Sequence, residues 1–411
     1  MTDMEFKHAE LANGLTIIVE ANPSAASMAA GFFVRTGSRD EAPEVAGVSH
    51  FLEHMMFKGT QRRTTFDVNR EFDDMGATYN AFTSEENTVY YAAVLSEYQT
   101  RVLDLLCDVL RPSLRREDFD VEKNVILDEI ARYEDTPSYR VYEKLMAEHF
   151  AGHPLGNSVL GTAESIGALG LEQMQAYFER RYSPLNVTAV GVGKVEFDSF
   201  VEKVSQMCLH WKPFQAARET LPAPLLRTQR VIPDPKVTRE HVGLMSPAPA
   251  GQDGARYAAQ LVSAILGDVT GSRLFYALID PAIADEAHMA YDLLDGAGAF
   301  VTFLSADADR AAEAVRIARA EFRKFLDEGP TDAEMRAAKN KIATGATLKG
   351  ELPMGRLAAV GFDWVYRREY VPLADQIRTL FAVTAGEVLE VARRYDLTAT
   401  TMLALGPLDE L

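Results

Sequence analysis

The chain has 411 residues, which is long enough for two or three domains of ordinary size. Its apolar fraction of 47% and charged fraction of 25% are typical of a globular protein that buries sizeable cores. The formal net charge of −18 argues against a nucleic-acid partner, because phosphates attract clustered Lys and Arg side chains.

The N-terminal stretch MTDMEFKHAELANGLTIIVE has no basic segment followed by an apolar one, so we expect no signal peptide. No uninterrupted apolar run approaches the roughly 18 residues that a membrane-spanning helix needs. Cys107 and Cys208 are too few for a disulfide framework, and there is no second pair for a zinc site. We therefore expect a cytoplasmic protein with no membrane partner.

The first half of the chain is predicted to open with strands and to continue mainly with helices. Apolar segments rich in β-branched residues follow the turn dipeptide Asn13-Gly14 and the break at Asn22-Pro23. The predicted strands are 15–21, 28–38, a strand pair within 77–95, and 186–195. Apolar residues at helical spacing, with glycine or proline stops, predict helices at 45–59, 64–76, 97–110, 115–133 and 171–182.

The composition changes at residues 212–230, a polar, aperiodic and proline-containing stretch that is typical of a linker. Beyond it a similar sequence of strands and helices recurs, with strands predicted at 230–235, 239–248 and 298–307 and helices at 255–268, 310–329 and 332–352. We infer a diverged duplication with domains 1–211 and 231–411. Because strands and helices are grouped rather than alternating, each domain is predicted to be α+β, a mostly antiparallel sheet layered with helices.

The segment SHFLEHMMF places two histidines and a glutamate inside an apolar run. On a helix, His50 and His54 lie on one face, where two imidazoles can hold one metal ion. Neutral imidazole suits Zn²⁺, whose catalytic sites use three protein ligands and an open position for water. Glu53 can reach such a water and act as a general base. The alternative is a pair of core or capping histidines, so a third ligand is the test.

Candidates for the third ligand lie in the segment DVEKNVILDEIARYEDTP, whose carboxylates include Glu122, Asp128, Glu129 and Glu134. Glu122 and Glu129 are seven residues apart, about two helical turns, and share a face with Val125 and Ile126. A carboxylate on an inward-facing helix needs a partner, and a metal ion is a suitable one. The alternative is a solvated helix face. Given the histidines, we predict that Glu129 is a ligand and that Glu122 orients a histidine or the site.

The order His-x-x-Glu-His is the inverted zinc-peptidase signature. The chain resembles the pitrilysin/insulinase family, specifically its branch similar to mitochondrial processing peptidases. The resemblance extends from about residue 10 to 275 and is carried, in family order, by GSRDE, GVSHFLEHMMFKGT, GATYNAFTSEENTVYY, EKNVILDEI, HPLGNSVLGTAESI, YFERRYSPLNVTAVGVG and GSRLF.

The resemblance implies that His50, His54 and Glu129 are zinc ligands, Glu53 is the general base and Glu122 is a supporting acid. It implies a zinc endopeptidase that cleaves peptides or unfolded segments in a chamber enclosed by four related domains. Because this chain is long enough for two, we expect a homodimer or a heterodimer with an inactive paralogue. The alternative is a non-catalytic or partner-dependent subunit that binds peptides. Retention of all the zinc ligands favours the enzyme.

The resemblance also implies substrate-binding residues. Asn80, Ala81 and Phe82 match the family's edge-strand segment, where a substrate peptide adds as a strand through main-chain hydrogen bonds. Family members commonly carry an Arg and a Tyr, seven residues apart, that bind substrate. This chain keeps Tyr291 but has Ala284 in place of the Arg. Either catalysis here does without that Arg, or another subunit supplies it.

Overall fold

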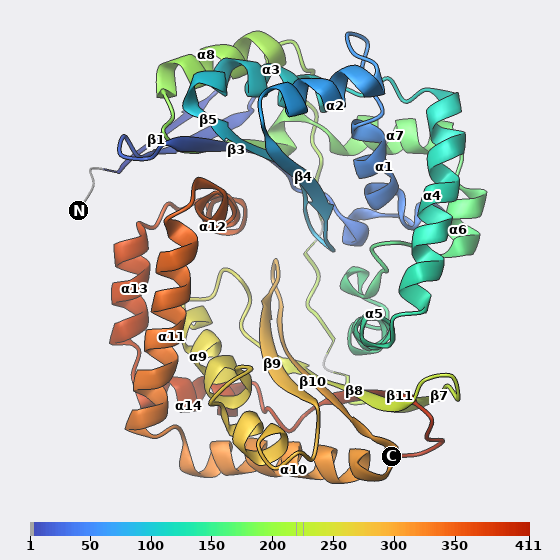
Figure 1. The fold of residues 1–411 in the computed structure, drawn as a ribbon, viewed down its shortest axis with the longest axis vertical. Coiled ribbons are helices and arrows are strands. Elements are labelled where there is room, and N and C mark those ends of the chain that lie inside the picture. The colour runs from blue at the N-terminus through green and yellow to red at the C-terminus, as the bar shows by residue number, and fades with distance from the viewer. Residues whose placement is uncertain (1–3, 219, 225) are drawn as a thin grey trace. The chain divides into compact units, whose positions relative to one another are not determined.

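The computed structural model describes residues 4–218, 220–224 and 226–411, and Figure 1 shows the fold. The described chain divides into two compact units. The N-terminal unit falls within residues 1–131, 157–219 and 348–371, and the C-terminal unit falls within 132–156, 220–347 and 372–411. Among the described helices, none combines the length and the apolar character that crossing a membrane requires.

The N-terminal unit is built on a six-stranded sheet with the strand order β1-β2-β6-β3-β5-β4. Its strands are β1 (Glu5–Glu10), β2 (Thr16–Ala21), β3 (Ser27–Val34), β4 (Thr78–Thr83), β5 (Thr88–Leu95) and β6 (Val187–Gly193). Neighbours are antiparallel except β2 and β6, which are parallel. The central strands β3 and β6 are buried almost throughout, whereas the edge strands β1 and β4 are largely exposed.

Helices pack on both faces of this sheet. They are α1 (Val48–Met56), α2 (Thr65–Asp74), α3 (Gln99–Val109), α4 (Arg116–Glu134), α6 (Ala163–Ala168), α7 (Leu171–Arg181), α8 (Phe197–Cys208) and α12 (Pro353–Arg367). Leu357 and Val360 of α12 pack against Ala29 and Phe33, which lie two strand periods apart and so point to the same face of β3. Helix α1 contacts β4 and β5, so its polar residues lie close to the sheet edge that β4 forms.

The C-terminal unit contains a five-stranded sheet with the order β7-β11-β8-β10-β9. Its strands are β7 (Gln229–Pro233), β8 (Arg239–Pro247), β9 (Glu286–Leu293), β10 (Gly298–Asp307) and β11 (Thr401–Gly406). Its helices are α5 (Pro137–His149), α9 (Arg256–Gly267), α10 (Ala308–Glu328), most of α11 (Asp332–Gly350), α13 (Leu373–Ala382) and α14 (Ala385–Arg394). Helices α9, α10 and α14 share one core with one face of the sheet, and α5 packs on the other face.

The two sheets have the same topology. Five strands of each sheet, taken in chain order, occupy the same positions and pair in the same directions. Their spatial orders are β2-β6-β3-β5-β4 and β7-β11-β8-β10-β9. In both sheets a helix also packs closely on a glycine of the equivalent strand. A Cβ on Gly31 of β3 would lie 3.1 Å from Leu357 of α12, and a Cβ on Gly243 of β8 would lie 2.7 Å from Leu145 of α5. The predicted fold class, two related α+β domains, is confirmed.

The compact units differ from the predicted domains 1–211 and 231–411 by an exchange of helices. Helix α5 lies within the first predicted domain but packs through Val141 and Leu145 in the C-terminal unit. Helix α12 lies within the second but packs in the N-terminal unit. An apolar stripe on a helix shows that the helix is buried, but it does not specify which sheet buries it. Domains drawn as two continuous stretches of sequence therefore cannot include this exchange of helices.

Candidate active site

Helix α1 carries His50, Glu53 and His54. Gly47 precedes the helix with φ of 88°, and a Cβ there would lie 2.5 Å from the Leu160 carbonyl oxygen, so glycine is needed at this tight turn. Phe51 stacks on Phe119 of α4, with ring centroids 4.8 Å apart. Burial of these aromatic faces holds α1 against α4, from which the predicted carboxylates project.

Buried polar groups fix the start of α1. Both oxygens of the Glu41 carboxylate accept backbone N–H bonds, at 2.6 Å from Gly47 and 2.7 Å from Ser49. Burial raises the pKa of Glu41 to about 8, against the opposing effect of these hydrogen bonds. The Ser49 hydroxyl lies 2.7 Å from Oη of Tyr177, which in turn lies 2.8 Å from Oγ1 of Thr36. Satisfied buried networks of this kind rigidify the elements they join.

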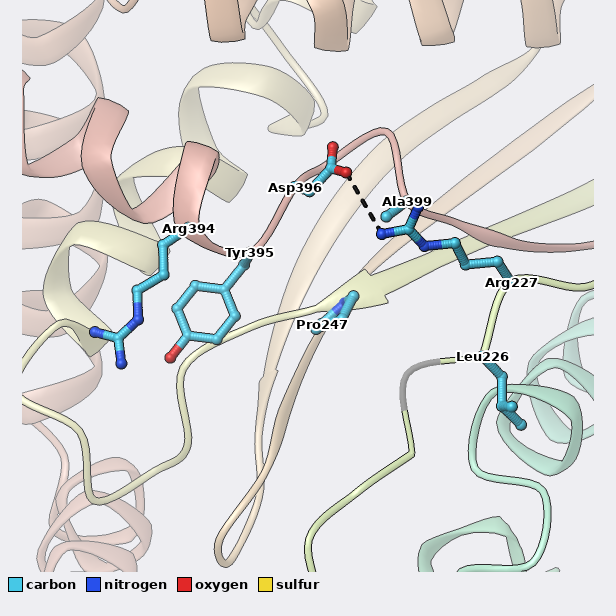
Figure 2. Close-up of a pocket in the computed structure, with 7 residues that line it drawn as sticks. All are labelled: Leu226, Arg227, Pro247, Arg394, Tyr395, Asp396 and Ala399. Atoms are coloured by element: carbon cyan, nitrogen blue, oxygen red, sulfur yellow. Dashed lines mark ion pairs between the residues drawn. The ribbon is translucent and has the colours of Figure 1, made fainter.

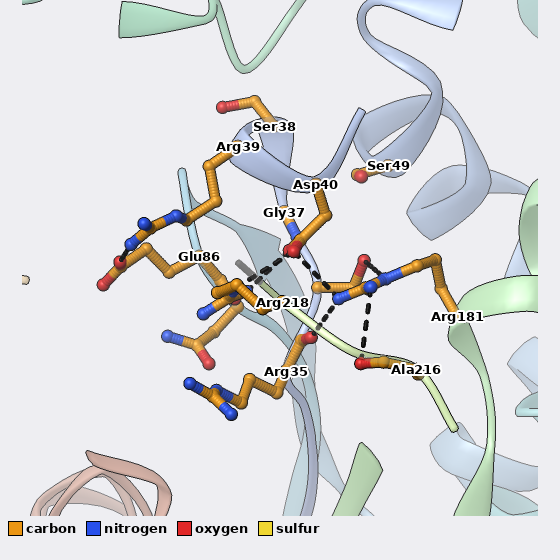
Figure 3. A network of polar contacts seen from close by, with 12 residues as sticks. Arg35, Gly37, Ser38, Arg39, Asp40, Ser49, Glu86, Arg181, Ala216 and Arg218 are labelled. Atoms are coloured by element: carbon orange, nitrogen blue, oxygen red, sulfur yellow. Dashed lines mark hydrogen bonds and ion pairs between the residues drawn. The ribbon is translucent and has the colours of Figure 1, made fainter. Parts of the chain in front are cut away.

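Charged side chains extend this network, and Figure 3 shows them around Asp40. The Asp40 carboxylate pairs with Arg181 at 2.9 Å and with Arg218 at 2.6 Å. Arg39 forms an ion pair with Glu86, and both of these side chains are 1% exposed. Because removing one member would leave a buried charge unpaired, the network constrains the backbone that leads into α1.

The side chains of His50, His54 and Glu129 converge, and each offers one ligand atom within 4.8 Å of the others. Oε2 of Glu129 lies 3.8 Å from Nε2 of His50 and 3.6 Å from Nε2 of His54. Zinc bonds of about 2.1 Å at tetrahedral angles separate ligand atoms by roughly 3.4 Å. Two imidazole nitrogens and a carboxylate oxygen at these separations therefore fit a zinc ion.

The two histidines differ in their surroundings. His50 is 8% exposed, and burial together with the charge of His54 lowers its pKa to about 3, so its imidazole is neutral and able to bind a metal. Burial also acts to lower the pKa of His54. The hydrogen bond to Glu122 and the charges of Glu53, Glu122 and Glu129 outweigh burial and raise that pKa.

The Glu122 carboxylate contacts His54, the histidine beside which its predicted orienting role would place it. Its Oε1 lies 2.8 Å from Nδ1 of His54, and Nε2 of the same ring faces Oε2 of Glu129. Its Oε2 lies 2.6 Å from Nζ of Lys58. Burial acts to raise the pKa of Glu122, but the hydrogen bonds from His54 and Lys58 outweigh it and lower the pKa. Sequence reasoning missed Lys58, although its spacing of four from His54 was available as a signal.

Glu53 is 9% exposed and its Oε2 accepts a 2.6 Å hydrogen bond from Oγ1 of Thr83 in β4. Burial raises the pKa of Glu53, with partial opposition from the Thr83 hydrogen bond and the charge of His54. Thr83 is a second residue that sequence reasoning missed. Its approach to Glu53 depends on the packing of α1 against β4, which no local pattern specifies.

The predicted substrate residues Asn80, Ala81 and Phe82 lie in β4, at the end of the sheet order. Asn80 and Phe82 are exposed and Ala81 is buried, as alternation along an edge strand requires. The backbone N–H of Ala81 donates to the Asn80 side chain at 2.9 Å. Among the described strands β4 pairs with β5 alone, so its other side can accept another strand.

Tyr291 lies in β9 of the C-terminal unit, and its hydroxyl donates a 2.7 Å hydrogen bond to the Pro249 carbonyl oxygen. Ala284, which stands where the family Arg is expected, is buried. The role of Tyr291 therefore stays a prediction.

A pocket of about 260 Å³ lies in the C-terminal unit, and Figure 2 shows its lining residues: Leu226, Arg227, Pro247, Arg394, Tyr395, Asp396 and Ala399. Arg227 and Asp396 form a 3.7 Å ion pair across it, and both side chains are well exposed. None of the predicted site residues lines this pocket, so it contributes nothing to the His–His–Glu cluster.

Two solved structures share this fold. A protease from Helicobacter pylori matches with a TM-score of 0.93 and 20% identity, covering 98% of this chain and 100% of that chain. A peptidase M16 inactive domain from Pseudomonas fluorescens matches with a TM-score of 0.91 and 18% identity, covering 99% of each. The chain therefore shares its fold with these two structures along nearly its whole length.

Sequence comparison identifies the family. Residues 16–163 match the insulinase (peptidase family M16) model, and residues 168–342 match the peptidase M16 inactive domain model. An uncharacterized zinc protease of Mycobacterium tuberculosis is 31% identical over 97% of this chain and 92% of its own length. One of Streptomyces coelicolor is 30% identical, with coverage of 97% and 89%. The chain belongs to the insulinase family, peptidase family M16.

Proposed function

We propose that this chain is a zinc-dependent endopeptidase that cleaves peptides or unfolded segments. The observation that carries the proposal is the convergence of His50, His54 and Glu129 beside the buried carboxylate of Glu53. The relatives in Mycobacterium tuberculosis and Streptomyces coelicolor are named zinc proteases, which supports the same metal and reaction.

The residues act in distinct ways. Zinc, when bound, lowers the pKa of a water molecule to about 7 and polarises a carbonyl group. Glu53 accepts the proton of the attacking water and passes it to the nitrogen of the leaving amine. Thr83 binds one oxygen of Glu53 and so leaves the other free to carry this proton. Burial of Glu53 raises its pKa, which favours holding the proton between the two transfers.

The substrate adds to β4 as an extended strand. Main-chain hydrogen bonds along Asn80, Ala81 and Phe82 bind the peptide whatever its side chains, which suits a peptidase of unfolded segments. Thr83 ends this strand and touches Glu53, so a peptide aligned on β4 runs toward the general base.

The chain acts as a dimer around an enclosed chamber, either with itself or with an inactive paralogue. Two duplicated units per chain support this assembly, because four related domains are needed for the family's chamber. Light scattering after size-exclusion chromatography tests the homodimer. The proposal would be contradicted if the chain were monomeric both by itself and after mixing with the paralogue.

The function is tested by mass-spectrometric profiling of a peptide mixture. We expect the chain to cleave internal peptide bonds, a chelator to stop cleavage, and added zinc to restore it. Cleavage that is indifferent to the chelator, or no cleavage by a zinc-loaded dimer, would contradict a zinc endopeptidase. The second result would favour the peptide-binding subunit instead.

A further inference from the structure

Lys58 follows the end of α1 and holds the second oxygen of Glu122. The Glu122 side chain is 4% exposed and divides its two oxygens between His54 Nδ1, at 2.8 Å, and Lys58 Nζ, at 2.6 Å. Lys58 itself is 31% exposed, so its ammonium group is only partly withdrawn from water. The pair is therefore unlike an exposed surface ion pair, which contributes little.

The backbone of Lys58 is itself fixed. Its carbonyl oxygen accepts hydrogen bonds from Thr65 Oγ1 at 2.8 Å and from Arg115 Nη2 at 2.5 Å. Its N–H donates to the Met55 carbonyl oxygen at 3.1 Å. These hydrogen bonds fix the position of the Lys58 backbone, so the side chain is placed to hold Glu122 in one orientation.

We propose that Lys58 is a positioning residue for the zinc centre, which acts by fixing the Glu122 carboxylate that orients His54. This inference rests on the proposed zinc-binding role of His50, His54 and Glu129. With Oε2 held by Lys58, Oε1 stays aligned with Nδ1 of His54, and Nε2 stays aimed at the metal. Without Lys58, a buried oxygen loses its partner and the carboxylate can rotate away from His54.

Zinc affinity measures this role independently of cleavage. Competition with a chromophoric chelator gives the zinc dissociation constant of the full chain and of its variants. We expect Lys58→Met to weaken zinc binding about tenfold, since loss of a supporting partner typically costs 10–100-fold. Lys58→Arg, which keeps a cationic donor, should recover most of the affinity.

Lys123→Met is the matched control. Lys123 is next to Glu122 in α4, but its ammonium binds the carbonyl oxygens of Gly167 and Leu169, at 3.1 and 2.7 Å. Its loss can lower stability but should leave the zinc dissociation constant unchanged. Circular dichroism verifies that each variant is folded before its affinity is compared.

The outcomes separate the two proposals. Equal zinc affinity in folded Lys58→Met and wild type would overturn the positioning role, and so would an equal loss in Lys123→Met. Tight zinc binding by a wild-type chain that cleaves no peptide would overturn the endopeptidase while leaving the Lys58 comparison valid. A wild-type chain that binds no zinc would overturn both.

Discussion

The carboxylates of the site differ in how their two oxygens are used. Glu122 has both oxygens occupied, by His54 and Lys58, whereas the hydrogen bond from Thr83 takes only one oxygen of Glu53. A residue that orients a ligand is best held at both oxygens. A residue that carries a proton needs one oxygen free, so this difference matches the roles proposed for Glu122 and Glu53.

Thr83→Val tests the contact to Glu53. We expect kcat to fall about tenfold with KM little changed, because a hydrogen bond to a carboxylate contributes roughly 1.5 kcal/mol. Thr83→Ser keeps the hydroxyl and should keep most of the activity, and Thr78→Val, at the exposed start of β4, is the control. Equal kcat values for the Val and Ser variants at position 83 would show that the contact has no catalytic effect.

Sequence spacing predicted the parts of the site that are local. His50, Glu53 and His54 share one helix, and Glu122 and Glu129 share another, so helical periodicity places each group on a face. The separation of His54 from Glu129 depends on how α1 packs on α4, and the contact of Thr83 depends on β4. These distances come from tertiary packing, for which the residues give no local signal.

Helix α12 shows how an element can be buried far from its chain neighbours. Its Arg356 forms a 2.7 Å ion pair with Glu20 of β2, and both side chains are at most 4% exposed. Gly361 of α12 packs against the ring of Phe33. A Cβ at position 361 would lie only 2.2 Å from the nearest ring atom. The apolar pattern predicts strands and helices over much of the chain. It does not predict which sheet α12 or α5 packs on, because that depends on complementary shapes and charges such as these.

Gly361→Ala tests this close packing. We expect it to lower the free energy of unfolding by roughly 1 kcal/mol, because overpacking costs about 1–3 kcal/mol and exceeds the gain in helix propensity. Gly345→Ala, in α11, is the matched control because a Cβ there meets nothing within 4 Å, so it should stabilise by up to about 1 kcal/mol. Urea denaturation measures both. A stabilised Gly361→Ala would contradict the close packing of α12 on β3.

The molecule is a duplication, and within the part of the chain that the structure describes the cluster of possible metal ligands lies in the first copy. Helix α9 occupies the place in the C-terminal unit that α1 and α2 occupy in the N-terminal unit, between the second and third strands of the shared topology. Its sequence, RYAAQLVSAILG, contains no histidine or carboxylate. The second unit therefore shares the fold of the first but has no metal-binding side chain on α9, and its residues 220–342 fall within the stretch that matches the peptidase M16 inactive domain model.

The stability of the molecule should fall in acid in part through His149, which is 1% exposed and lies 3.1 Å from Thr401 Oγ1. Burial lowers the pKa of His149 from 6.5 to about 4. Between these values the unfolded chain binds a proton that the folded chain does not, so stability is lost as pH falls through this window. The expected loss is about 2 kcal/mol at about pH 5 relative to about pH 8.

His149→Gln removes this titration and keeps a hydrogen-bonding side chain. Its urea midpoint should therefore drop less than that of the wild type between about pH 8 and about pH 5. The same drop in both proteins would show that His149 does not titrate across this window.

The central claim is that a zinc ion held by His50, His54 and Glu129 works with Glu53 as general base. Glu53→Gln tests it most directly, with zinc content and peptide cleavage measured on the same preparation. We expect the variant to keep its zinc, because Glu53 is not a ligand, and to lose cleavage by roughly 10²–10⁴-fold. Cleavage at the wild-type rate, or loss of zinc together with activity, would contradict the account.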